Sequence, residues 1–118
     1  MKIRLLSALI CLLACNWILA QNKKELLEWE TTLNDATKPR AERMQAGVDL
    51  GEKLFLSDPA KADSIWNVAI RLDKNEKEIK QLSTLLVNTG VMLTRGGEPD
   101  SAIKHFRKAL EYRSVLGD

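Results

Sequence analysis

The feature that most constrains this chain is an internal repeat in the part that follows residue 50. A shift of 40 residues aligns Ala62 with Ala102, Trp66 with Phe106, Ala69 with Ala109 and Ile70 with Leu110. A shift of 39 residues aligns Gly51 with Gly90 and Leu54 with Leu93. Small residues seven positions apart share one stripe of a helix, where a neighbouring helix can approach closely. Such a repeat predicts two copies of one helical unit that stack to bury their apolar faces.

Turn and capping signals divide the rest of the chain into helices. Helix-forming and charged residues dominate from Lys23 onward, and no long alternating β-branched run occurs. Pro59 and Pro99 suit the first turn of a helix, and Gly96 or Gly97 suits a left-handed C-terminal cap. These signals predict an all-α fold with helices near residues 23–34, 39–56, 59–72, 76–95 and 99–116.

We assign ten residues of the repeat to packing within and between the two helical hairpins. Gly51 and Gly90 allow close helix approach, although each costs about 1 kcal/mol in helix propensity. Trp66 and Phe106 fill the space between the alanines. The full set is Gly51, Leu54, Ala62, Trp66, Ala69, Gly90, Leu93, Ala102, Phe106 and Ala109.

Residues 89–118 resemble a tetratricopeptide repeat, since Gly90, Leu93, Ala102, Phe106 and Ala109 follow the order of small, aliphatic and aromatic residues in that family. The resemblance covers residues 41–118. The period near 40 and the closing residues 116–118 are similar to the longer-linker repeats of kinesin light chains and of exported Bacteroidetes-type signalling proteins.

The resemblance implies antiparallel hairpins stacked as a short right-handed superhelix. It implies a degenerate hairpin at 39–74 and a second hairpin at 75–118. Residues 21–38 would form an N-terminal capping helix in which Trp29 covers the edge of the first hairpin, or alternatively part of a degenerate earlier hairpin.

The same resemblance implies a concave groove, lined by the first helix of each hairpin, in which an extended peptide lies. The groove residues would be Gln45, Val48, Glu52, Phe55, Thr84, Val87, Asn88, Val91 and Arg95. Asn88 can donate to and accept from a peptide backbone, and Arg95 can pair with a carboxylate. Alternatively, Asn88 is a solvated helix residue and Arg95 only a favourable charge at a helix C-terminus.

The N-terminal segment has the pattern of an export signal. Lys2 and Arg4 precede an apolar run that ends at Ala20, so residues 1–20 are predicted to be a signal peptide cleaved after Ala20. In the second alternative, the four residues ending at Cys15 resemble a lipobox whose cysteine is acylated, which would tether the protein to a membrane. The third alternative is an uncleaved anchor, although the apolar run is shorter than the roughly 20 residues that a membrane span needs.

Charge and cysteine usage exclude several functions for the exported chain. Cys11 and Cys15 both lie in the N-terminal segment, so the remainder forms no disulfide and no thiolate metal site. Without Lys2 and Arg4 the 18 basic residues fall to 16 and balance the 16 acidic ones. This balance argues against nucleic-acid binding.

Catalytic patterns are also missing. His105 is the only histidine, and we interpret it as a surface residue, because Asp100 and Ser101 nearby are explained by helix capping. The sequence contains no Gly-rich phosphate loop, zinc-ligand spacing or nucleophile elbow. We therefore expect no catalytic residue, metal or cofactor.

These features predict a non-catalytic module that binds a protein or peptide outside the cytoplasm. One alternative is the N-terminal sensory piece of a signalling protein, such as a histidine kinase or a transcription regulator. Another is a lipoprotein acylated at Cys15. Because repeat stacks usually need three units and a polar cap, we also expect an open apolar end that self-associates or packs on a further repeat.

Overall fold

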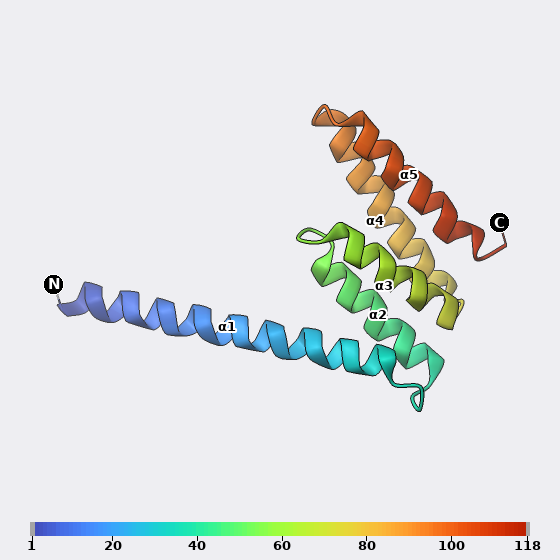
Figure 1. Cartoon of the computed structure of the whole chain (residues 1–118). Coiled ribbons are helices and arrows are strands. Elements are labelled where there is room, and N and C mark those ends of the chain that lie inside the picture. Colours follow the sequence, from blue (N-terminus) through green and yellow to red (C-terminus); the bar gives the residue numbers. More distant parts are fainter. Residues whose placement is uncertain (1, 118) are drawn as a thin grey trace.

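Four of the five helices in the described residues, 2–117, form two antiparallel pairs (Figure 1). In this computed structural model the helices are α1 (Lys2–Asn34), α2 (Arg40–Leu54), α3 (Pro59–Leu72), α4 (Glu76–Arg95) and α5 (Pro99–Ser114). Helix α2 packs on α3, which we call the first hairpin, and α4 packs on α5, the second hairpin. The predicted all-α class is confirmed for residues 2–117.

Helix α1 differs from the prediction, which placed a helix start near Lys23. The structure instead has one unbroken helix from Lys2 to Asn34. The reason is local: residues 20–24 contain neither proline nor glycine, so nothing interrupts the backbone hydrogen bonds there.

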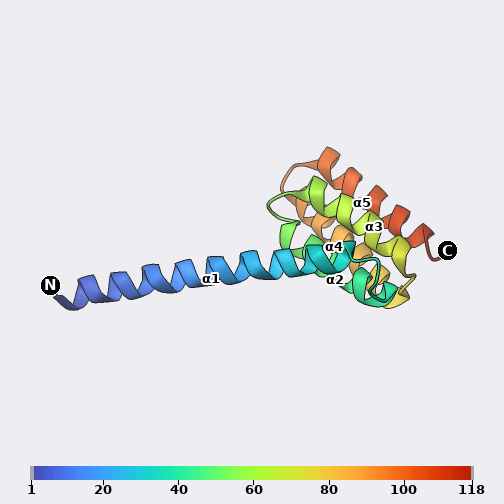
Figure 2. The same cartoon turned by 60° about the horizontal axis from the view of Figure 1, so that its bottom comes forward.

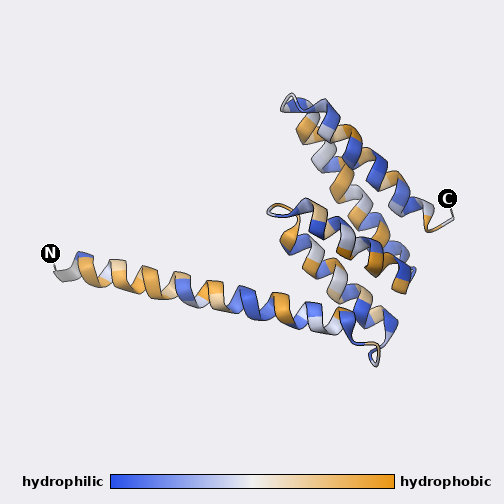
Figure 3. Ribbon diagram, viewed as in Figure 1, coloured by the Kyte–Doolittle hydropathy of each residue, from blue (hydrophilic) through white to orange (hydrophobic). Residues whose placement is uncertain are grey.

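The N-terminal part of α1 projects away from the hairpins (Figure 2). Side chains from Arg4 to Glu25 are exposed, and Figure 3 shows that apolar residues are concentrated toward this end. An 18-residue window of α1 has a mean hydropathy of 1.7, so the helix is long and apolar enough to cross a membrane. A signal sequence near the N-terminus has the same properties.

The C-terminal turns of α1 pack on α2. Leu33 is buried and its methyl groups lie against Gly47, while Leu26 and Trp29 are half-buried. The Arg43 side chain donates from Nε to the Leu33 carbonyl oxygen at 3.0 Å, which satisfies one of the free carbonyls at the end of α1.

Side-chain and glycine caps define the turns between the helices. Asp58 precedes Pro59 and accepts a hydrogen bond from the backbone N–H three residues later, and Asn75 does the same at the start of α4. Of the two candidate glycines after α4, Gly97 adopts the left-handed conformation with φ of 80°, whereas Gly96 has φ of −80°. Local chemistry therefore places each boundary.

A glycine faces an aromatic ring in each hairpin. A Cβ added at Gly51 would overlap the indole of Trp66, most closely at Nε1, and one added at Gly90 would lie 2.6 Å from Cε1 of Phe106. The Trp66 Nε1–H also donates to the Val48 carbonyl oxygen at 3.2 Å. Both hairpins thus use the absence of one Cβ to bring a ring against the opposite helix.

The four repeat alanines lie in the core. Ala62 and Ala69 are fully buried, and Ala102 and Ala109 expose no more than 3% of their surface. Their size lets the helices within each hairpin approach closely.

The two hairpins share one hydrophobic core. It contains Met44, Val48, Phe55, Ala62, Trp66, Ala69 and Ile70 from the first hairpin with its following turn, and Ile79, Leu82, Leu86, Ala109 and Tyr112 from the second. The rings of Trp66 and Tyr112 meet edge to face with centroids 6.4 Å apart. This core joins the hairpins beside the cleft described next.

Candidate functional site

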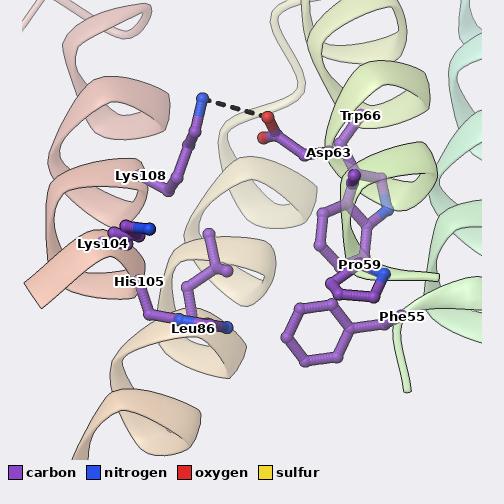
Figure 4. Close-up of a pocket in the computed structure, with 9 residues that line it drawn as sticks. Phe55, Pro59, Asp63, Trp66, Leu86, Lys104, His105 and Lys108 are labelled. Carbon is purple, nitrogen blue, oxygen red and sulfur yellow. Dashed lines mark ion pairs between the residues drawn. The ribbon is translucent and has the colours of Figure 1, made fainter. Parts of the chain in front are cut away.

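A cleft lies between the two hairpins, with walls formed mainly by α3 and α5 (Figure 4). Its volume is about 200 Å³. The apolar lining consists of Phe55, Pro59, Ala60, Trp66 and Leu86. The polar lining consists of Asp63, Lys104, His105 and Lys108.

The floor of the cleft is rigid and aromatic. Phe55 follows α2 and packs on Trp66 with ring centroids 5.3 Å apart, and the His105 ring meets Phe55 edge-on at 5.9 Å. Trp66 is held on its other side by the close approach of Gly51. Because these rings belong to the core, the floor is formed before any ligand arrives.

The charge of Asp63 is satisfied within the protein. Its Oδ1 accepts a hydrogen bond from the Tyr112 hydroxyl at 2.5 Å, and its Oδ2 lies 3.0 Å from Lys108 Nζ. Burial, followed by the hydrogen bond to Asp63, raises the pKa of Tyr112, and the hydrogen bond to Asp63 raises the pKa of Lys108. Lys108 also lies 3.4 Å from Glu111, so neither Asp63 nor Lys108 offers a free charge to the cleft.

Lys104 and His105 complete the rim of the cleft. Lys104 forms no ion pair with any other residue that the structure describes. His105 Nδ1 donates to the Ser101 carbonyl oxygen at 2.8 Å, which requires a proton on Nδ1 and leaves Nε2 unused by that bond. The rim therefore carries one uncompensated positive charge, and the imidazole has one nitrogen available.

The predicted concave groove needs correction at two positions. Val48 is 1% exposed and Phe55 8% exposed, because both pack in the shared core and do not face the predicted groove. The remaining groove residues are exposed: Gln45, Glu52, Thr84, Val87, Asn88, Val91 and Arg95. Phe55 instead lines the cleft between α3 and α5, on a different side from that predicted.

The surface where α2 and α4 meet is acidic. Partial desolvation, followed by the neighbouring carboxylates of Asp49 and Glu78, raises the pKa of Glu52. Gln45 donates one N–H of its side-chain amide to Asp49 at 3.1 Å. Like charges of this kind oppose an acidic peptide at the predicted groove.

A second candidate surface lies on α4 and α5, on the far side from the first hairpin. We call it the end face, formed by Val87, Phe106, Ala109, Leu110 and Arg113 around a cavity of about 360 Å³.

Four positions of the end face are the repeat counterparts of residues buried in the first hairpin, and of these only Ala109 is itself buried. Val48 and Ile70 are each 1% exposed, whereas Val87 is 38% and Leu110 70% exposed. Trp66 is buried while Phe106 is half-buried. The reason is that the second hairpin shares a core with the first, whereas none of the described residues covers the equivalent surface of the second.

Sequence reasoning missed the cleft. The sequence predicts His105 as a surface residue and gives no sign that it lies beside Lys104 and Lys108 at a cleft. The available signal was their shared helix stripe at a spacing of four together with a single acid, Asp63, on the facing helix. That juxtaposition spans 45 residues and becomes visible only in the tertiary structure.

Comparison with protein-family models, curated proteins and solved structures finds no match to this chain.

Proposed function

We propose that this chain is a non-catalytic, protein-binding module of tetratricopeptide-like hairpins that acts outside the cytoplasm. The apolar part of α1 would serve export or membrane tethering. It is suited to this role because its side chains from Arg4 to Glu25 are exposed and contribute nothing to the core of the hairpins.

The observation that carries the proposal is the end face. Val87 and Leu110 occupy the repeat positions of Val48 and Ile70, which are buried between the hairpins. A surface built to the same pattern and left exposed favours docking of another helical element.

The first hairpin indicates the chemistry of that element. Its buried face receives Ile79, Leu82 and Leu86 of α4, which recur at spacings of three and four residues along one side of that helix. The end face is therefore expected to take an amphipathic helix with a similar aliphatic stripe. Arg113 at its edge favours an acidic residue beside that stripe.

The cleft supports a binding role more than catalysis. A general base needs a partner that orients it, usually an acid on the second ring nitrogen of a histidine. His105 instead uses Nδ1 to bond a carbonyl of its own helix, and Asp63 is engaged by Tyr112 and Lys108.

Site-specific photo-crosslinking tests the proposal. The photoreactive residue p-benzoylphenylalanine would replace Leu110 on the end face or, as a control, Leu56, which is 93% exposed but lies in the turn after α2. In cells that make the full chain, we expect a discrete adduct with another polypeptide from position 110 and none from position 56. Adducts of equal yield from both positions, or none from 110, would contradict the proposal.

A further inference from the structure

We propose that the cleft between α3 and α5 is a second binding site, which takes one apolar side chain of an extended peptide whose next residue is acidic. The site is separate from the end face. Peptide binding at the cleft can therefore be tested independently of docking at the end face.

The volume of the cleft limits its occupant to about one side chain. Sites for cofactors and drug-sized molecules usually enclose about 300–1,000 Å³, whereas this cleft measures about 200 Å³. A phenyl or branched aliphatic group fits such a space, while a larger free ligand would remain mostly in solvent. The occupant is therefore better supplied by a polypeptide that also contacts the surface around the cleft.

The floor explains the apolar part of the preference. Phe55, Trp66 and Leu86 line the cleft with the small part of their carbon surface that remains accessible, and all three belong to the shared core. An aromatic side chain placed there would meet Phe55 and Trp66 at the tilted and edge-on geometries that such rings prefer. Little reorganisation is needed, because the rings are already fixed by the hairpin packing.

The rim explains the acidic part of the preference. Asp63 forms an ion pair with Lys108 and accepts a hydrogen bond from the Tyr112 hydroxyl. The negative charge in the cleft is therefore already compensated. Lys104 remains as a positive charge without an ion-pair partner among residues 2–117. A carboxylate one residue beyond the buried side chain would complement Lys104.

Four blocked hexapeptides serve as probes, with two glycines on each side of a central pair. The central pairs are Phe-Asp, Ala-Asp, Phe-Asn and Phe-Lys. Binding would be measured by NMR titration of the full chain in detergent micelles, following the three indole N–H signals, with helicity checked by circular dichroism.

The Phe-Asp peptide is expected to bind about tenfold or more tightly than Ala-Asp, which corresponds to burial of the phenyl group. It is expected to bind about two- to fivefold more tightly than Phe-Asn, as one exposed ion pair allows. Phe-Lys should be the weakest of the three phenylalanine peptides.

Matched variants test separately the contribution of the buried apolar side chain and that of the neighbouring acidic residue. Ala60 and Ala41 are both exposed second residues of a helix, but only Ala60 lines the cleft. Ala60→Phe should fill the cleft and weaken Phe-Asp binding at least about tenfold, whereas Ala41→Phe should not. Lys104→Glu should reverse the preference from Phe-Asp to Phe-Lys, while Lys77→Ala, on an exposed residue outside the cleft, should leave it unchanged.

Equal affinity for Phe-Asp and Phe-Lys, or an Ala60→Phe variant that binds as tightly as the unmodified chain, would overturn the assignment. No binding of Phe-Asp below about 10 mM would do the same. A position-110 crosslink together with any of these results would leave the proposed function in place and remove only the cleft from it.

Discussion

Substituting the two repeat glycines by alanine tests the asymmetry between the hairpins. Gly51→Ala places a methyl group against the indole of Trp66, and Gly90→Ala places one against the ring of Phe106. The initial overlap is greater at Gly51, because the added Cβ lies closer to Nε1 of Trp66 than the one at Gly90 lies to any atom of Phe106. The room behind each ring differs as well.

Trp66 is held in place by its burial and by its contacts with the surrounding residues. It is 1% exposed, donates a hydrogen bond to the Val48 carbonyl, and meets Tyr112 edge-on. Overpacking around a fixed core residue destabilises the fold by up to about 3 kcal/mol. Replacing glycine by alanine stabilises the helix by about 1 kcal/mol through the higher helix propensity of alanine. Gly51→Ala should therefore lower the free energy of unfolding by about 2 kcal/mol.

Phe106 can swing toward the uncovered end face, where it is half-buried. The overpacking cost should then fall to about 1 kcal/mol, which the gain in helix propensity offsets. Gly90→Ala should leave the free energy of unfolding within about 0.5 kcal/mol of the original value. The difference between the variants arises from the closer initial overlap at Gly51 and from the room behind each ring.

Thermal unfolding followed by circular dichroism at the helix band would measure both effects. A loss of about 2 kcal/mol in a folded unit of this size lowers Tm by about 8–16 °C. Gly96→Ala is the control, because Gly96 has φ of −80° and its added Cβ would meet nothing closer than 3.4 Å. Equal destabilisation by Gly51→Ala and Gly90→Ala, or no loss with Gly51→Ala, would refute the described packing.

Three further predictions follow from the structure. Because the pKa of Tyr112 is raised by folding, its contribution to stability is complete below its unfolded pKa of about 10 and is lost as pH rises above that value. Tyr112→Phe should cost about 0.5–1.5 kcal/mol at pH 7 and reduce this alkaline loss, as urea unfolding across pH would show. Ala102→Leu and Ala109→Leu should each cost about 1–3 kcal/mol in urea unfolding, whereas Lys104→Leu should not, and equal tolerance at all three positions would contradict the buried stripe. Mass spectrometry of the exported chain should show cleavage after residue 20 without lipid; an acyl group that is lost in Cys15→Ala would instead establish the lipoprotein alternative.

The sequence by itself determined the secondary structure of residues 40–114 closely. The signals are local: Asp58 and Pro59 start α3, Asn75 starts α4, and Gly97 ends the turn before α5. Capping and backbone conformation depend on residues within one or two turns, so they can be read without knowing the rest of the molecule. The continuous helix near Lys23 was predictable from the same local features, because residues 20–24 contain neither proline nor glycine.

Only the tertiary structure decided which side chains are exposed. Val48 and Val87 match in the repeat, yet one is buried and the other exposed, because a second hairpin stacks on the first and none of the described residues stacks on the second. The cleft arises in the same way, from Asp63 and Lys108 brought together across the two hairpins. Stacking joins residues far apart in the chain, and its geometry depends on the summed packing of the whole core, which no single segment contains.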